Sequence, residues 1–115
     1  MEDKKVSILG TEYDIKYTTI EKDIKLSECG GYCDFTIKAI RVLDNEPDPI
    51  NSLTNLDVHK RKVARHEIVH AFLIESGLDS QSDWATNEEM VDYFARQLEK
   101  IYKACKDADV LEEGR

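Results

Sequence analysis

The residues best suited to chemistry in this chain lie in the segment RHEIVHAF, residues 65–72. His66 and His70 are four positions apart, so on a helix their imidazoles project from one face toward the same point, as two metal ligands would. Glu67 is rotated from His66 by about 100°, which keeps its carboxylate out of the same coordination sphere but within reach of a metal-bound water. The segment therefore predicts two zinc ligands and a general base.

An alternative interpretation is that His66 and His70 are half-buried residues on the face of an ordinary amphipathic helix. In shuffled chains of this composition the pattern H-E-x-x-H arises in roughly 1% of cases, so the motif alone is not decisive. A catalytic zinc ion normally takes three protein ligands and keeps one position for water. A suitable third ligand would therefore favour the metal site.

The segment TNEEMVDYFARQL, residues 86–98, offers that third ligand on a second amphipathic helix. On a helical wheel that starts at Val91, the apolar stripe centres at about 340°, Glu88 lies at about 60° and Glu89 at about 160°. Glu88 borders the buried face, whereas Glu89 points away from it and also fits a capping box with Thr86. We predict Glu88 as the third zinc ligand, with Glu89 as the alternative.

Two further side chains near this constellation have a candidate role. Asp92 follows Glu88 by one turn on the same side of the helix, where it could accept the remaining N–H of a ligating histidine and fix its tautomer. The alternative for Asp92 is an ordinary solvated carboxylate. His59 lies seven residues before His66, about 10 Å away along the helix axis, which is too far to bind the same ion.

The first part of the chain, residues 5–43, is expected to be rich in β-structure. Alternating apolar and polar residues over 5–18 predict a hairpin that turns near Gly10. Residues 19–30 are highly charged and are expected to form a surface connection. The segment YCDFTIKAIRVL, residues 32–43, reads as one long strand or as strand, turn and strand, and its change of apolar parity favours a turn in the middle.

The second part of the chain has a helical period. We predict helices over residues 57–76, ended by Gly77, and over 86–105, with Trp84 as a core anchor before the second helix and a frayed tail over 106–115. The loop between sheet and helices, DNEPDPINSLTN, cannot be regular because of its prolines. The expected fold class is α+β, a single domain over 1–115 in which a small antiparallel or mixed sheet of three or four strands packs against two main helices.

The composition excludes several classes of partner and location. A formal net charge of -8 and a pI of about 4.8 argue against a nucleic-acid binder, and no apolar run is long enough to span a membrane. Three cysteines are too few for a secreted disulfide framework and lack the matched pairs of a zinc knuckle: Cys29, Cys33 and Cys105. We therefore expect reduced thiols and a cytoplasmic location.

Together, HEIVH and the later NEEMVDYFA resemble the gluzincin metallopeptidases, in which HExxH is followed by a helix carrying E-x-x-x-D. The segments are also similar to the ImmA/IrrE family of small metallopeptidases from phages and mobile elements, whose helix reads E-x-x-A-N-x-F-A. Glu88, Phe94 and Ala95 match that helix, while Val91 stands at its alanine and Asp92 at its asparagine. The resemblance covers roughly residues 31–102.

The resemblance implies a minimal zincin-like core and zinc-dependent hydrolysis of peptide bonds, with Zn²⁺ held by His66, His70 and Glu88. Glu67 would act as the general base. The implied partner is a peptide or protein substrate, such as a phage or host regulator, in a bacterial cytoplasm. If the strand over residues 34–43 forms the sheet edge nearest the helix, it could hold an extended peptide. A zinc-binding but non-proteolytic interaction module remains the alternative function.

Overall fold

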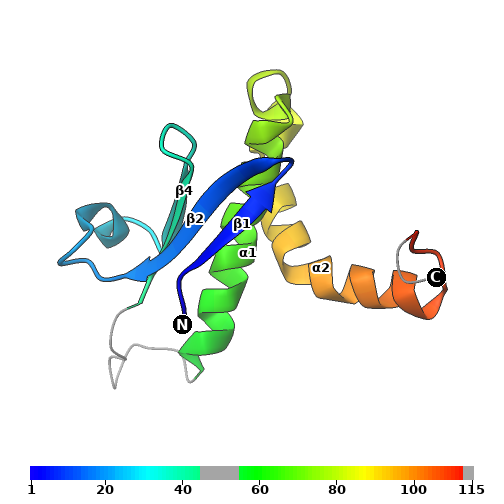
Figure 1. Cartoon of the computed structure of the whole chain (residues 1–115), viewed down its shortest axis with the longest axis horizontal. Helices are drawn as coiled ribbons and strands as arrows, with labels where there is room; N and C mark the ends of the chain where they lie inside the picture. The colour runs from blue at the N-terminus through cyan, green and yellow to red at the C-terminus, as the bar shows by residue number, and fades with distance from the viewer. Residues whose placement is uncertain (45–54, 113–115) are drawn as a thin grey trace.

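Four short strands form one mixed sheet in the computed structural model, which describes residues 1–44 and 55–112 (Figure 1). The sheet order is β1-β2-β4-β3, with β2 and β4 parallel and the two outer pairs antiparallel. The predicted α+β class is confirmed, and the sheet is of the mixed kind. The strand bounds are β1 Lys4–Ile8, β2 Thr11–Thr18, β3 Gly31–Asp34 and β4 Ala39–Leu43.

Two tight connections determine the local pairing of the strands. β1 and β2 form the predicted hairpin, and its two turn residues, Leu9 and Gly10, both have positive φ angles, as a two-residue turn that matches the twist of a hairpin requires. β3 and β4 form the predicted strand, turn and strand, with Lys38 at a φ of 55° in the turn. In the connection before β3, the expected surface segment contains a 3-10 turn, Ile24–Ser27, whose Leu26 is buried.

Helix α1, Leu56–Glu75, crosses one face of the sheet. Asn55 caps its first turn, because the side-chain oxygen accepts a hydrogen bond from the N–H of Val58. After the helix, Gly77 takes the left-handed conformation, with a φ of 84°. The predicted helix is confirmed, and each boundary lies one residue earlier than expected. Most of the irregular loop predicted before it lies outside the described residues.

The core lies between α1 and the sheet. Small side chains on α1, Ala64 and Ala71, let the helix come close to the large apolar residues of the strands. These two alanines are seven residues apart, so they lie on one face of the helix, and Glu67 lies between them on that face. The sheet supplies buried side chains from three strands to this core: Ile8, Tyr13, Ile15, Ile40 and Val42.

Helix α2 spans Glu88–Asp107 and corrects two expectations. Its N-cap is Asn87, whose side chain accepts a hydrogen bond from the N–H of Met90, so the capping box of Thr86 and Glu89 is wrong. Thr86 instead ends a 3-10 turn, Asp83–Thr86, and its hydroxyl donates to the carbonyl of Asp83. The helix begins and ends two residues later than predicted, so the start of the expected frayed tail is helical.

The two halves of α2 have different surroundings. In the first half, Val91 and Ala95 are fully buried where the helix packs against α1, whereas the second half leads away from the sheet and from α1 (Figure 1). Trp84, expected as a core anchor, is 52% exposed, and its neighbour Ala85 is the buried residue of that turn. None of the described helices carries an apolar stretch sufficient to cross a bilayer.

The C-terminal end of α1 is held to the sheet by a partly buried polar contact. The hydroxyl of Tyr13 donates to Oε2 of Glu75 over 2.6 Å, and the ammonium of Lys38 donates to the same oxygen over 2.8 Å. These two hydrogen bonds, that of Lys38 first, lower the pKa of Glu75 to about 2. The charged form of Glu75 is therefore the form that the fold stabilises.

We predict that Glu75→Gln lowers the free energy of unfolding at neutral pH and that the loss shrinks in acid. The folded pKa of about 2 lies below the ordinary value of 4.5, so the carboxylate stabilises the fold above roughly pH 5 and this contribution disappears as the pH falls toward 2. Urea denaturation of both proteins at neutral pH and at about pH 3 measures the difference. Glu12→Gln on the exposed side of β2 is the control, and an equal loss at both pH values would contradict the prediction.

Candidate metal centre

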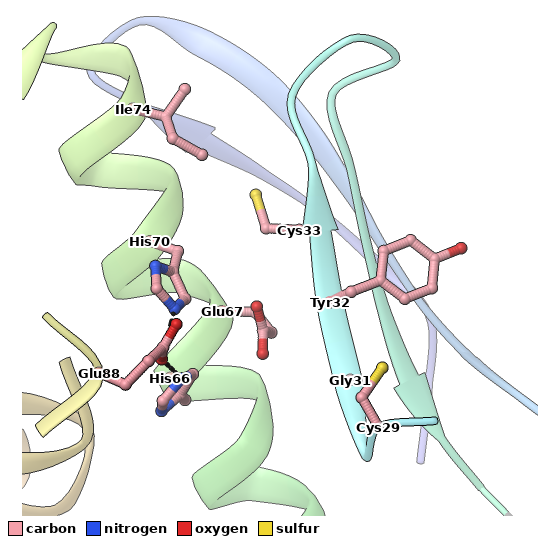
Figure 2. A pocket seen from close by; sticks show the side chains of 9 residues that line it. All are labelled: Cys29, Gly31, Tyr32, Cys33, His66, Glu67, His70, Ile74 and Glu88. Carbon is pink, nitrogen blue, oxygen red and sulfur yellow. Dashed lines mark hydrogen bonds and ion pairs between the residues drawn. The ribbon is translucent and has the colours of Figure 1, made fainter. Parts of the chain in front are cut away.

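His66 and His70 lie on consecutive turns of α1 and face the start of α2 (Figure 2). Their ring centroids are 4.9 Å apart. Oε1 of Glu88, the first residue of α2, lies 2.9 Å from Nε2 of His66 and 3.0 Å from Nε2 of His70. Each residue therefore offers one ligand atom to the same small space, and these three atoms lie within 4.8 Å of one another.

The selection of Glu88 over Glu89 agrees with this geometry. Glu88 is 69% exposed at its side chain, yet its carboxylate is directed at the two imidazoles. Glu89, one residue later in the first turn of α2, is exposed and does not belong to the cluster. Because Asn87 caps the helix, Glu88 is the first residue of α2, and this end of α2 faces His66 and His70 on α1.

The donor set fits a transition metal. In a tetrahedral zinc site with bonds of about 2.0–2.2 Å, neighbouring ligand atoms are about 3.3–3.6 Å apart. The nitrogen-to-oxygen distances of 2.9 and 3.0 Å would need to widen by only a few tenths of an ångström. Two imidazoles and a carboxylate also suit other divalent metals, so the donor set supports a metal site without selecting zinc.

Asp92 lies beside Nδ1 of His66. Its Oδ1 is 3.4 Å from Nδ1 of His66, and the same carboxylate contacts Arg96 at 2.7 Å and Lys62 at 3.0 Å. The hydrogen bonds from Arg96 and Lys62 hold the pKa of Asp92 well below its usual range. A permanent anion beside Nδ1 favours a proton on that nitrogen, a tautomer that would leave the lone pair of Nε2 available to bind a metal.

Among the described residues, Glu67 is the one charged residue that is buried, with 7% of its surface exposed. It is buried because its position on α1 faces the sheet between Ala64 and Ala71. Its carboxylate lies between α1 and β3, beside the histidines (Figure 2). Burial raises the pKa of Glu67 to about 7, with His70 lowering it and Glu88 raising it. A carboxyl group poised near neutrality can both accept and return a proton.

The cluster lies in the middle of a groove between α1 and β3. Three adjoining hollows form this groove. The central hollow shares Gly31, His66 and Glu67 with the hollow toward the start of α1. It shares Ile74 with the hollow toward the end of α1. The hollow toward the start of α1 adds polar residues: His59, Lys62 and Asp92. The hollow toward its end adds Phe35, Lys38, Glu75, Asp79 and Ser80. His59 is thus a groove residue outside the metal cluster.

Sequence reasoning missed three residues that shape the central hollow: Gly31, Cys33 and Ile74. Alternation along β3 places Gly31 and Cys33 toward α1. Burial raises the pKa of Cys33 to about 12, so it remains a thiol. The pair Gly30-Gly31 at the start of β3 is the sequence signal for a close approach, but a pair of glycines also suits a loop. All three cysteines are unpaired, and none belongs to the cluster.

Hydrolysis of a peptide bond needs a hydrogen-bond donor for the developing oxyanion, and a tyrosine hydroxyl near the cluster could supply it. β3 does run beside α1, but the Tyr32 ring lies on the opposite side of that strand from the histidines (Figure 2). Its hydroxyl donates to Oδ2 of Asp23. Tyr93 on α2 is 57% exposed and stacks edge-on with Phe94. Neither tyrosine hydroxyl is therefore directed at the cluster.

We predict that Gly31→Ala destabilises the protein and widens the groove. A Cβ at this position would lie 2.6 Å from Cγ1 of Val63 and 3.0 Å from the carbonyl oxygen of Arg41, so β3 must move away from α1, at a cost of about 1–3 kcal/mol. Chemical denaturation measures the loss. Gly30→Ala is the matched control, because its Cβ would meet only Val63 at 3.9 Å. Equal stability of the two variants would contradict the close approach.

Comparisons with known proteins add no assignment to this geometry. No protein-family model, curated protein or solved structure matches the chain. The metallopeptidase resemblance therefore stays a prediction that rests on short motifs.

Proposed function

We propose that this chain is a zinc-dependent peptidase. One observation carries the proposal: ligand atoms of His66, His70 and Glu88 converge in the middle of a groove, and the buried carboxylate of Glu67 lies beside them. A site that only stabilised the fold would have no need of a buried base and would usually offer a fourth protein ligand. Among the described residues the cluster offers three.

The proposed chemistry divides between the metal and the side chains. A bound zinc ion would polarise a peptide carbonyl and lower the pKa of its water toward neutrality. Glu67 takes the proton of the attacking water and returns it to the leaving amine, a role supported by its burial and its pKa of about 7. Asp92 keeps His66 oriented through Nδ1.

The proposed substrate is an extended segment of a peptide or protein. The condition that residues 34–43 form the sheet edge is not met for most of that range, because β4 is internal to the sheet, between β2 and β3. The edge beside the cluster is β3, Gly31–Asp34. An extended chain could pair with this edge and pass through the groove across the cluster. The unpaired cysteines support a reducing cytoplasm as the place of the reaction.

A non-proteolytic zinc-binding module is the second candidate. The position of Tyr32 favours this alternative, because its hydroxyl donates to Asp23 on the side of β3 away from the cluster. Peptidases of this type need a donor for the developing oxyanion besides the metal. In this alternative, the same cluster and groove would bind a partner without cutting it.

The metal site predicts one zinc ion per chain. We expect His70→Ala and Glu88→Gln each to weaken zinc binding by at least about tenfold, because each removes one of three ligands. Competition with a chromophoric chelator measures the affinity. Glu89→Gln removes the same charge one residue later and should bind zinc like the wild type. Binding without a one-to-one stoichiometry, or equal losses for Glu88→Gln and Glu89→Gln, would refute the assigned site.

The role of Glu67 predicts a separation of binding from catalysis. We expect the wild type to cleave members of a peptide library, and Glu67→Gln to keep stoichiometric zinc while losing cleavage by about a hundredfold or more. Removal of zinc with a chelator should abolish cleavage, and added zinc should restore it. If both proteins bind zinc and neither cleaves a peptide, the peptidase proposal is contradicted and the non-proteolytic zinc-binding module is supported.

A further inference from the structure

The second half of α2 presents an apolar face that the described residues leave uncovered. This α2 stripe comprises Phe94 at 36% exposure, Leu98 at 44%, Ile101 at 40%, Tyr102 at 57% and the half-buried Cys105. It continues the face that Val91 and Ala95 bury against α1 earlier in the helix. Near the middle of α2, Arg65 of α1 donates to the carbonyl of Ala95 and to the Glu99 carboxylate.

The spacing of the stripe matches the seam of a two-helix pair. Its apolar residues follow at intervals of three and four, which is the repeat that keeps one face of a helix against a second helix over several turns: Val91, Phe94, Leu98, Ile101 and Cys105. The positions that border the seam are normally charged and select the partner, but here they are Ala95, Gln97, Tyr102 and Ala104. Two copies of this face would therefore meet no like-charge repulsion along the seam.

Charges just outside the seam favour one orientation. Counted around the helix from Val91, Glu99 lies at about 80° and Lys106 at about 60°, so both border the same side of the stripe. When two identical helices run antiparallel about an axis near Ile101 and Tyr102, this side meets itself, and each Glu99 comes within about 3 Å, measured along the axis, of the level of Lys106 of the second copy. The Glu99 side chain is 75% exposed and free to extend toward it while keeping its contact with Arg65.

The shape of the molecule allows this pairing. The second half of α2 leads away from α1 and the sheet (Figure 1), so an antiparallel partner would place the two domains at opposite ends of the paired helices. We propose that this chain forms a two-fold symmetric dimer through the α2 stripe, with the second copy of the chain as its occupant. The candidate metal centre lies at the other end of α2, so the proposed dimer does not depend on it.

The exposed apolar area of the α2 stripe determines how tightly two copies are expected to bind. The stripe offers only a few hundred Å² of apolar surface on each copy, below the roughly 800 Å² per partner of a standard stable interface. We therefore expect a reversible monomer–dimer equilibrium in the micromolar range. Sedimentation equilibrium of the full chain over a series of concentrations measures it, and a protein that stays monomeric into the high micromolar range would overturn the proposal.

Substitutions locate the interface. We expect Leu98→Glu to weaken dimerisation by about a hundredfold or more, since it places a charge in the centre of the seam. Lys106→Glu should weaken it by about three- to tenfold through its two symmetric pairs. Lys103→Glu makes the same charge change at about 120° from Val91, off the seam, and is the matched control. Circular dichroism checks that each variant is folded, and a dimer that is insensitive to Leu98→Glu would overturn the proposal.

Cross-linking tests the orientation. In the antiparallel pair, position 98 faces Cys105 of the second copy, whereas the two native Cys105 residues are about 10 Å apart along the axis. We expect Leu98→Cys to form a disulfide from position 98 to Cys105 under mild oxidation, with the linked peptides identified by mass spectrometry. A link between the two Cys105 residues of the wild type would indicate a parallel pair and overturn the antiparallel arrangement.

Discussion

The close approach of α1 to the sheet is the constraint on which the rest of this structure depends. Ala64 and Ala71 on the helix and Gly31 on β3 leave room for it, since a methyl group at Gly31 would already overlap Val63. Glu67 lies on the same helix face, so the contact that forms the core also removes this carboxylate from water. Its raised pKa is thus a consequence of how the helix packs and needs no separate device.

The same packing separates the roles of neighbouring residues on α1. A rotation of about 100° from Glu67 brings its neighbour His66 off the sheet and toward α2, where His70 joins it one turn later. The short turn that ends at Asn87 then brings the first residue of α2 against both imidazoles. Two adjacent positions in the sequence therefore lie in different surroundings, one apolar and enclosed, the other open to a ligand.

Local features of the fold could be predicted from the sequence, whereas features that depend on distant segments could not. The hairpin at Gly10, the end of α1 before Gly77 and the pairing of His66 with His70 follow from residues close together in the chain. The direction of Glu88 toward the two histidines could also be predicted, because a helical wheel reports orientation even when the capping residue is misplaced, whereas its role as a ligand stays a prediction. The parallel pairing of β4 with β2 could not be predicted, because it joins segments that are far apart in the sequence and no local pattern in either segment indicates the other. The prediction of Trp84 as a core anchor was wrong for a similar reason, because the burial of an aromatic residue depends on which distant segments cover it.

The shortness of β3 has a consequence for how the protein behaves in a crowded solution. A free strand edge can pair with the edge of another molecule and begin an aggregate, and long flat edges carry the greatest risk. β3 has only four residues, and at its end Asp34 accepts hydrogen bonds from the N–H and hydroxyl of Thr36, which turns the chain away. An edge of this length is long enough to receive one short peptide segment and too short to template a growing sheet.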